Sequence, residues 1–192
     1  LDHDNAYTLF CASQPPERTA WPANFSIRTT RVPSRWLTAG WHKLRLPFPA
    51  ERLAGACDIF HSPDFTLPPL RKARGVVTVH DLSFLRVPQC ADPGLRAFLE
   101  RAVPRSLARA SRVLADSENT KRDLIELLDV APEKISVVPA GIEPRFQPVG
   151  DAAVLAGVRA RYKLPEWFIL MVGTIEPRKN LSRLITAYGR LR

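Results

Sequence analysis

Short apolar runs alternate along this chain with segments whose apolar residues recur at helical spacing. The runs have the length, and often the β-branched or aromatic content, of strands in a sheet that is covered on both faces. Gly75–His80 is the clearest of them, because it contains Val76, Val77 and Val79. The predicted strands are Tyr7–Ala12, Cys57–His61, Gly75–His80, Arg112–Ala115, Ile135–Val138 and Trp167–Val172.

The segments between these runs predict helices. Ser117 is placed to cap a helix whose leucines gather on one face. Pro104 interrupts the helical pattern of Gly94–Ala110, so we expect that helix to be kinked or split. Ser13–Arg35 is aperiodic and predicts a long loop. The other predicted helices are Trp36–Leu46, Ala152–Tyr162 and Asn180–Leu191.

The alternation of strands and helices predicts an α/β fold, in which helices cover a parallel sheet. Glu143–Val149 contains Pro144 and Pro148 and therefore predicts a linker. We expect one domain over residues 1–148. Residues 149–192 would then form the opening strand–helix unit of a second domain that this chain does not finish.

Polar residues follow four of the predicted strands at the point where each strand ends. Because the carboxyl ends of parallel strands meet at one edge of a sheet, these clusters predict the rim of a ligand-binding cleft. The candidate residues at the rim of the first domain are His61, Asp64, His80, Asp81 and Ser117. The cluster in the second domain runs from Gly173 to Asn180 and includes Thr174, Arg178 and Lys179.

Each cluster also has an ordinary structural interpretation. His80 and Asp81 can form a turn in which backbone groups satisfy the histidine. Ser117 is suited to capping a helix, and Asp64 to solvation or an Asx-turn. The two basic residues of the last cluster can be a solvated pair that precedes a helix.

The last cluster has a physical reason to bind an anion. It joins a strand to a helix, so the free N–H groups at the start of that helix point toward the strand edge. Arg178 adds a guanidinium fork and Lys179 adds an ammonium group, and both suit a diphosphate. The loop is not the GxGxxG of dinucleotide enzymes, and the sequence contains no Walker A P-loop. Nicotinamide and P-loop chemistry are therefore disfavoured.

The net charge of +9 and the pI near 10.1 invite comparison with nucleic-acid-binding proteins. The arginines are scattered, however, with no lysine-rich tail and no basic run interleaved with aromatics. A nucleotide diphosphate or an anionic membrane surface fits this charge as well as DNA does. Cys11, Cys57 and Cys90 are widely spaced and form no CxxC pair. This spacing argues against a disulfide framework or a zinc site and favours a reducing compartment.

Three segments in order, Val76–Pro88, Arg112–Pro148 and Phe168–Tyr188, resemble glycosyltransferase family 4, the group 1 glycosyltransferases. Cys57–Pro69 fits the same pattern, and the resemblance is strongest to the mannosyltransferase-like bacterial members. It implies a GT-B fold, with two Rossmann-like domains that face each other across a cleft, the first for acceptor and the second for donor. It also implies transfer of a sugar from a nucleotide-sugar with retention of configuration and without a bound metal.

The resemblance assigns roles to several of the candidate residues. Lys179, with Arg178 beside it, would stabilise the charge that develops on the leaving nucleotide diphosphate. His80 matches the histidine that lies near the transferred sugar, and Gly173 would let the backbone approach the donor closely. Thr174 stands where many relatives carry arginine. His61, Asp64, Asp81 and Ser117 remain acceptor-side candidates.

By the same resemblance, a Gly-rich loop would precede Leu1 and a donor-binding E-x7-E segment would follow Arg192. We therefore expect this fragment alone to be inactive, while the complete protein would act on a glycan or lipid-linked acceptor in the cytoplasm. Arg18–Arg45, with Trp21, Phe25, Trp36 and Trp41, could meet an anionic inner membrane face, or those aromatics could simply cover the core. A non-catalytic nucleotide-binding module is the main alternative, and nucleic-acid binding rests on charge alone.

Overall fold

The computed structural model describes residues 4–12 and 21–191 and divides into two compact units. The first unit comprises the chain up to Pro88 together with Asp92–Pro139. The second comprises Gln89–Ala91 and Ala140 onward. Each unit is described by itself.

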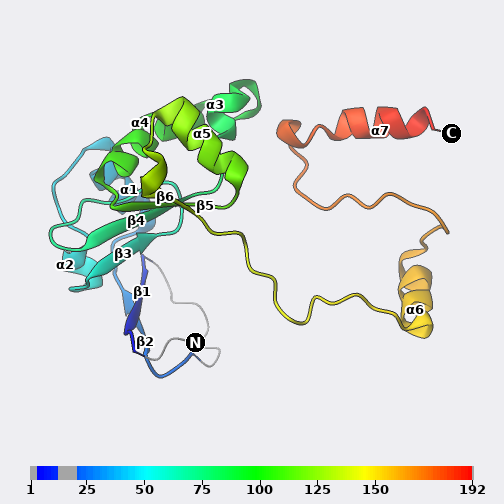
Figure 1. Ribbon diagram of the computed structural model, residues 1–192, viewed down its shortest axis with the longest axis horizontal. Coiled ribbons are helices and arrows are strands. Elements are labelled where there is room, and N and C mark those ends of the chain that lie inside the picture. The colour runs from blue at the N-terminus through cyan, green and yellow to red at the C-terminus, as the bar shows by residue number, and fades with distance from the viewer. Residues whose placement is uncertain (1–3, 13–20, 192) are drawn as a thin grey trace. The chain divides into compact units, whose positions relative to one another are not determined.

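The first unit is built on two parallel sheets (Figure 1). The larger has four strands in chain order, so each strand is hydrogen-bonded to the next. The prediction of an α/β fold with parallel strands is confirmed. The larger sheet consists of β3 (Ile59–Ser62), β4 (Arg74–Val79), β5 (Arg112–Ala115) and β6 (Ile135–Val137), and the smaller of β1 (Tyr7–Cys11) and β2 (Phe25–Thr29).

The two-stranded sheet corrects two predictions. β2 lies inside the segment predicted as a long loop. The expectation of one parallel sheet for the first domain is wrong, because β1 and β2 pair only with each other. Cross-strand contacts stabilise this pair. The rings of Tyr7 and Phe25 stack with centroids 4.7 Å apart, and the hydroxyls of Thr8 and Ser26 lie 3.0 Å apart. A five-residue strand with a polar exposed side gives too weak an alternation to be recognised from sequence.

Helices cover the larger sheet, with α4 in contact with β4 and α5 with β5 (Figure 1). The core between them is aliphatic, and Val77, Val79, Val113 and Leu124 are fully buried. The helices of this unit are α1 (Ser34–Thr38), the π-helix η1 (Ala39–Lys43), α2 (Glu51–Ala54), α3 (Ser83–Arg86), α4 (Pro93–Arg109), α5 (Glu118–Leu128) and the 3-10 helix η3 (Pro132–Lys134).

Two helix predictions in this unit need correction. The helix around Pro104 was predicted to be kinked or split, and of these two alternatives the split is wrong, because α4 continues as one helix through Pro104. A proline removes only one helical hydrogen bond, and the buried residues Val103 and Leu107 hold both sides of that position against the core. The helix predicted over Trp36–Leu46 begins earlier, at Ser34, and its second half is the π-helix η1.

The second unit contains α6 (Ala152–Tyr162), which coincides with the prediction, and α7 (Leu181–Gly189). Short 3-10 turns, η2 (Pro88–Cys90) and η4 (Pro177–Lys179), complete the helices. The Asp151 side chain caps α6 by accepting hydrogen bonds from the N–H groups of Ala153 and Val154. Residues 140–150 form neither helix nor strand, so Pro148 lies within the connecting segment.

The strand predicted at Trp167–Val172 is absent from the described structure. The run pairs with no other described strand, and Trp167, Leu170 and Val172 are 83%, 74% and 85% exposed. A strand exists only through hydrogen bonds to a neighbour, and no part of this second unit supplies one. Among the described residues, no helix is both long and apolar enough to span a bilayer.

Candidate functional site

Three strand ends of the larger sheet converge on the side chain of His80. The residue follows β4 directly, and its two ring nitrogens reach groups that follow the neighbouring strands. Nδ1 lies 2.8 Å from a carboxylate oxygen of Asp116, the residue after β5. Nε2 lies 2.9 Å from the backbone carbonyl oxygen of Pro63, just beyond β3. Parallel strands in register bring these ends to one edge, as the sequence predicted.

The surroundings of His80 favour the imidazolium form. Its two partners are hydrogen-bond acceptors, and a neutral imidazole has only one N–H to donate, whereas the charged form donates from both nitrogens. The hydrogen bond to Asp116 raises the pKa of His80, partial burial opposes the rise, and the Pro63 carbonyl and the charge of Asp64 support it. His80 is therefore a hydrogen-bonding side chain at this edge whose pKa is raised, and both side chains of the pair are about two-fifths exposed.

The backbone of His80 is fixed by the start of α5. The hydroxyl of Thr120 donates to the His80 carbonyl oxygen at 2.9 Å. Ser117 accepts a hydrogen bond from the Thr120 N–H at 3.1 Å, which makes it the N-cap of that helix. The capping interpretation of Ser117 is thus confirmed, and the residue helps to position Thr120, which contacts the His80 backbone.

The other candidates of the first domain lie near this edge without joining the His80 group. A carboxylate oxygen of Asp81 accepts from the Ser83 N–H at 2.8 Å, which caps the first turn of α3. His61 Nε2 lies 2.8 Å from the Thr78 hydroxyl across strands β3 and β4, and burial lowers the pKa of this ring. Asp64 is exposed on the loop that carries Pro63, and its charge contributes to the raised pKa of His80.

Asp116 is the functional residue that the sequence analysis did not single out. It stands in the polar cluster after β5, and the relevant signal was its position directly after the strand that neighbours β4. The ring of Phe65 also meets His80 edge-on, with centroids 5.6 Å apart. Phe65 has a positive φ of 50°, an uncommon conformation for an aromatic residue, which turns the loop back toward the sheet.

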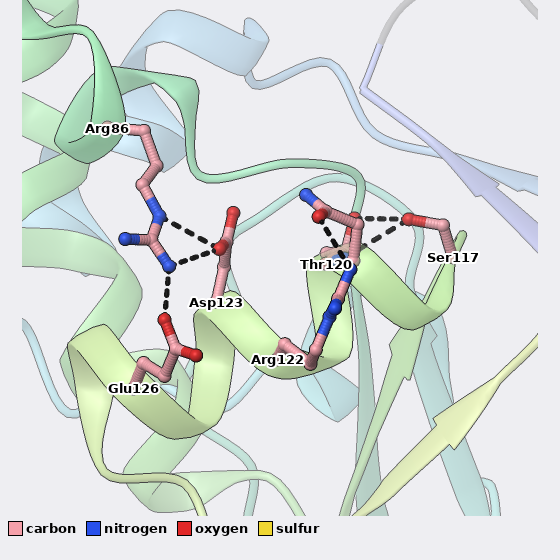
Figure 2. Close-up of polar contacts among 7 residues, drawn as sticks. Arg86, Ser117, Thr120, Arg122, Asp123 and Glu126 are labelled. Atoms are coloured by element: carbon pink, nitrogen blue, oxygen red, sulfur yellow. Dashed lines mark hydrogen bonds and ion pairs between the residues drawn. The ribbon is translucent and has the colours of Figure 1, made fainter.

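A second polar group, made of Arg86, Asp123 and Glu126, ties α3 to α5 (Figure 2). Nε and Nη2 of Arg86 donate to one oxygen of Asp123 at 2.9 and 2.7 Å, and Nη2 also contacts Glu126. Asp123 is buried, so this pairing satisfies a carboxylate that would otherwise be costly to bury. α3 follows His80 in the chain, and Thr120 of α5 contacts the His80 backbone. The Arg86 ion pairs therefore connect the two helices that flank the histidine.

The predicted diphosphate-binding residues occupy one loop of the second unit. Gly173 and Thr174 open it, and Arg178 and Lys179 close it in the turn η4, directly before α7. Arg178 pairs with Glu176 at 2.7 Å, whereas none of the ion pairs within residues 4–12 and 21–191 involves Lys179. Gly173 has φ 157°, at the limit of the region that favours glycine.

Comparison with known proteins identifies the family. Residues 2–146, well over half of the chain, match the domain described as Glycosyltransferase Family 4. This chain belongs to glycosyltransferase family 4. Its parallel α/β architecture is that of a Rossmann-like domain of the family, so the resemblance drawn from the three sequence segments is confirmed.

Individual relatives of this family 4 chain are distant. O-antigen chain mannosyltransferase B of Escherichia coli is 31% identical over 134 residues, which cover 69% of this chain and 35% of that protein. A D-inositol 3-phosphate glycosyltransferase of Salinispora tropica is 35% identical over 162 residues, which cover 74% of this chain and 33% of that protein. The chain thus spans about a third of the length of these curated relatives.

Proposed function

We propose that this chain provides the acceptor-side domain and the first donor-side elements of a retaining, GT-B-type glycosyltransferase. The reaction transfers a sugar from a nucleotide diphosphate-sugar to a glycan or lipid-linked acceptor. The observation that carries the proposal is the position of His80 in a family 4 domain. Its ring nitrogens contact Asp116 and the Pro63 carbonyl at the edge where three parallel strands end.

His80 acts, in this proposal, as the group nearest the transferred sugar. Its Nε2–H donates to the Pro63 carbonyl in the structure, and that partner is on a loop. A sugar hydroxyl can replace the carbonyl as acceptor with little change in geometry. Asp116 raises the pKa of the ring and orients it through the Nδ1 contact, so it is a positioning residue.

Lys179 and Arg178 act, in this proposal, on the diphosphate of the donor. As the bond between the sugar carbon and the diphosphate oxygen breaks, that oxygen gains negative charge, and positively charged donors stabilise it. Lys179 is exposed and not held by a described carboxylate, so it is free to meet a phosphate. Arg178 has first to leave Glu176, which makes its contribution the smaller of the two.

Mannose is the sugar that the relatives favour. The E. coli proteins similar to this chain are named mannosyltransferases, whereas the Salinispora proteins are named for inositol 3-phosphate. We therefore propose mannose as the donor sugar.

The test is a transfer assay on the natural gene product that carries this chain, with a panel of nucleoside diphosphate sugars that includes GDP-mannose. We expect transfer with retained anomeric configuration, read by NMR. His80→Ala should lower kcat strongly while the affinity for free nucleoside diphosphate stays the same. Tight diphosphate binding without transfer or hydrolysis of any donor would instead establish the non-catalytic nucleotide-binding module.

A further inference from the structure

The first unit contains a second polar region, in a cavity of about 90 Å³ between η1 and the C-terminal half of α4. That volume is the room that about three water molecules occupy, at about 30 Å³ each. A tetrahedral oxyanion is of comparable size. The cavity is lined by Trp41, His42, Arg45, Pro69, Ala102, Arg105 and Arg109.

The cavity lies at the edge of the sheet opposite the one that carries His80. Arg109 is the last residue of α4 and precedes the start of β5, whereas Asp116 follows the end of β5. The N–H of Ser111 donates to the Gly75 carbonyl at 2.7 Å, which places this end of α4 beside the beginning of β4. The length of β4, roughly 17 Å or more at about 3.3 Å per residue, separates the two regions.

Three guanidinium groups surround the cavity without a carboxylate among the lining residues. Arg45, Arg105 and Arg109 take part in none of the ion pairs formed within the described part of the chain. Burial lowers the pKa of Arg109, and the charge of Arg105 lowers it further. The arrangement brings like charges together at a partly buried place, which is unfavourable unless an anion offsets it.

His42 experiences the same field. Burial and the nearby charge of Arg109 lower its pKa to about 4, so the ring is neutral at physiological pH and can donate or accept one hydrogen bond. Its edge meets Phe98 of α4, with ring centroids 6.1 Å apart, which holds the imidazole at the cavity wall.

The remaining wall is apolar and fixed. The indole N–H of Trp41 donates to the Phe48 carbonyl at 2.8 Å, so Trp41 presents its ring to the cavity. Pro69 and Ala102 add further apolar surface. A lining that combines several guanidinium groups with apolar side chains suits a compact oxyanion that several arginine N–H groups can bind at once.

We propose that this cavity binds a phosphate group, at a site separate from the donor diphosphate loop. Arg105 and Arg45 supply the charge-assisted hydrogen bonds, and Arg109 completes the positive field. The phosphate belongs either to a free phosphorylated metabolite or to a phospholipid headgroup. Trp36 and Leu44, which flank η1 and are 63% and 71% exposed, would give a lipid additional apolar contact.

Calorimetry with inorganic phosphate, at fixed ionic strength in chloride buffer, tests the site in the 192-residue chain. Arg105→Met is the main variant, because no described hydrogen bond depends on that side chain. We expect it to weaken phosphate binding about tenfold or more. Arg45→Met should act in the same direction. Arg109 is left unchanged, because its guanidinium also contacts the Leu67 carbonyl.

Arg101→Met is the matched control. Arg101 lies one turn before Arg105 on the same helix and loses the same charge, but it does not line the cavity. If Arg105→Met weakens phosphate binding and Arg101→Met leaves it intact, the result supports the proposal and a free phosphorylated metabolite as the ligand. Equal effects of the two variants, or no binding by the parent chain to either phosphate or vesicles, overturn it.

Flotation with vesicles separates the two sources. One set contains phosphatidylcholine alone and the other contains phosphatidylcholine with phosphatidic acid, both at moderate salt. Binding to the second set only, lost in Arg105→Met and kept in Arg101→Met, supports the proposal and assigns the phosphate to a lipid. If both variants reduce vesicle binding equally, the attraction is a general effect of charge, and this result contradicts a specific site in the cavity.

Discussion

His80 and Asp116 are the two side chains whose interaction can be followed directly by titration. We expect Asp116→Asn to return the pKa of His80 downward toward its ordinary value near 6.5, because the variant removes the carboxylate that raises it. NMR of the imidazole carbon-bound protons measures this. A pKa that does not move would show that the carboxylate has no part in keeping His80 charged.

The same pair gives a pH-dependent contribution to stability. A group whose pKa is raised by folding contributes most below its unfolded pKa, about 6.5 for histidine, and less as the pH rises through the folded pKa. The parent chain should therefore exceed Asp116→Asn in unfolding free energy most clearly between about pH 5 and 6.5. In that window aspartate is ionised and an unperturbed histidine is still largely protonated. Because both side chains are about two-fifths exposed, we expect a small difference, read from urea unfolding at several pH values.

Lys179 is the residue on which the diphosphate assignment depends most. In the natural gene product, Lys179→Ala should weaken binding of nucleoside diphosphate by about one to two decades, since a charge-assisted hydrogen bond contributes about 1.5–3 kcal/mol. Lys163→Ala is a suitable control, because Lys163 is an exposed lysine of the same unit at the end of α6. Calorimetry that finds equal affinity in both variants would remove the assignment.

At the scale of elements, Glu51 ties α2 to the segment before β4. One of its carboxylate oxygens accepts hydrogen bonds from the N–H groups of Arg71, Lys72 and Ala73 at 2.8, 3.0 and 3.1 Å. Burial acts to raise the pKa of Glu51, but these backbone bonds outweigh it and lower the pKa to about 2. A single side chain thus satisfies three backbone donors that no strand neighbour takes up.

This tether should fail in acid. Folding lowers the pKa of Glu51, so its contribution to the unfolding free energy is complete above the unfolded-state pKa of about 4.5. That contribution is lost as the pH falls toward 2. Glu51→Gln should therefore cost about 1 kcal/mol of unfolding free energy at pH 7 and almost nothing near pH 2. Glu133→Gln, which neutralises an exposed glutamate, is the control. Denaturant unfolding that finds the same loss at both pH values would contradict the mechanism.

At the scale of the whole molecule, the apolar run at residues 168–172 needs a partner. The run has the composition of a buried strand, yet it is unpaired in the second unit. In the 192-residue chain, backbone amides of this run should exchange with deuterium quickly. They should become protected in any longer polypeptide that supplies a donor-side sheet. Protection already present in the 192-residue chain, measured by mass spectrometry, would mean that another surface covers it.

The same reasoning applies to activity. Transfer requires donor and acceptor to be held in reacting geometry, which contributes several kcal/mol, roughly 7–11 in favourable cases. In the second unit, which we propose to be the donor side, the described regular elements after residue 140 are α6, η4 and α7, without a strand. We therefore expect the 192-residue chain by itself to release no product from a nucleotide-sugar, as chromatography of the reaction would show. Product formed by the purified chain would contradict this expectation.

The sequence by itself determined the features that depend on neighbours along the chain. Hydrophobic periodicity located β4 and β5, and local side-chain–backbone bonds explain why Ser117 and the start of α6 were placed correctly. The edge of the sheet that carries the polar residues also followed from strand direction alone, because parallel strands end together. Two of the segments that carried the family resemblance overlap β4 and β5.

The tertiary structure decided what depends on partners distant in sequence. It joined His80 to the Asp116 carboxylate and the Pro63 carbonyl, whereas Asp81, also a polar residue at a strand end, accepts from a local backbone N–H. Periodicity also cannot state whether a strand has a neighbour, which is why β2 was missed and Trp167–Val172 was predicted as a strand. Hydrogen bonding between strands and the packing of side chains from different elements are long-range interactions. Only the folded chain brings their partners within reach.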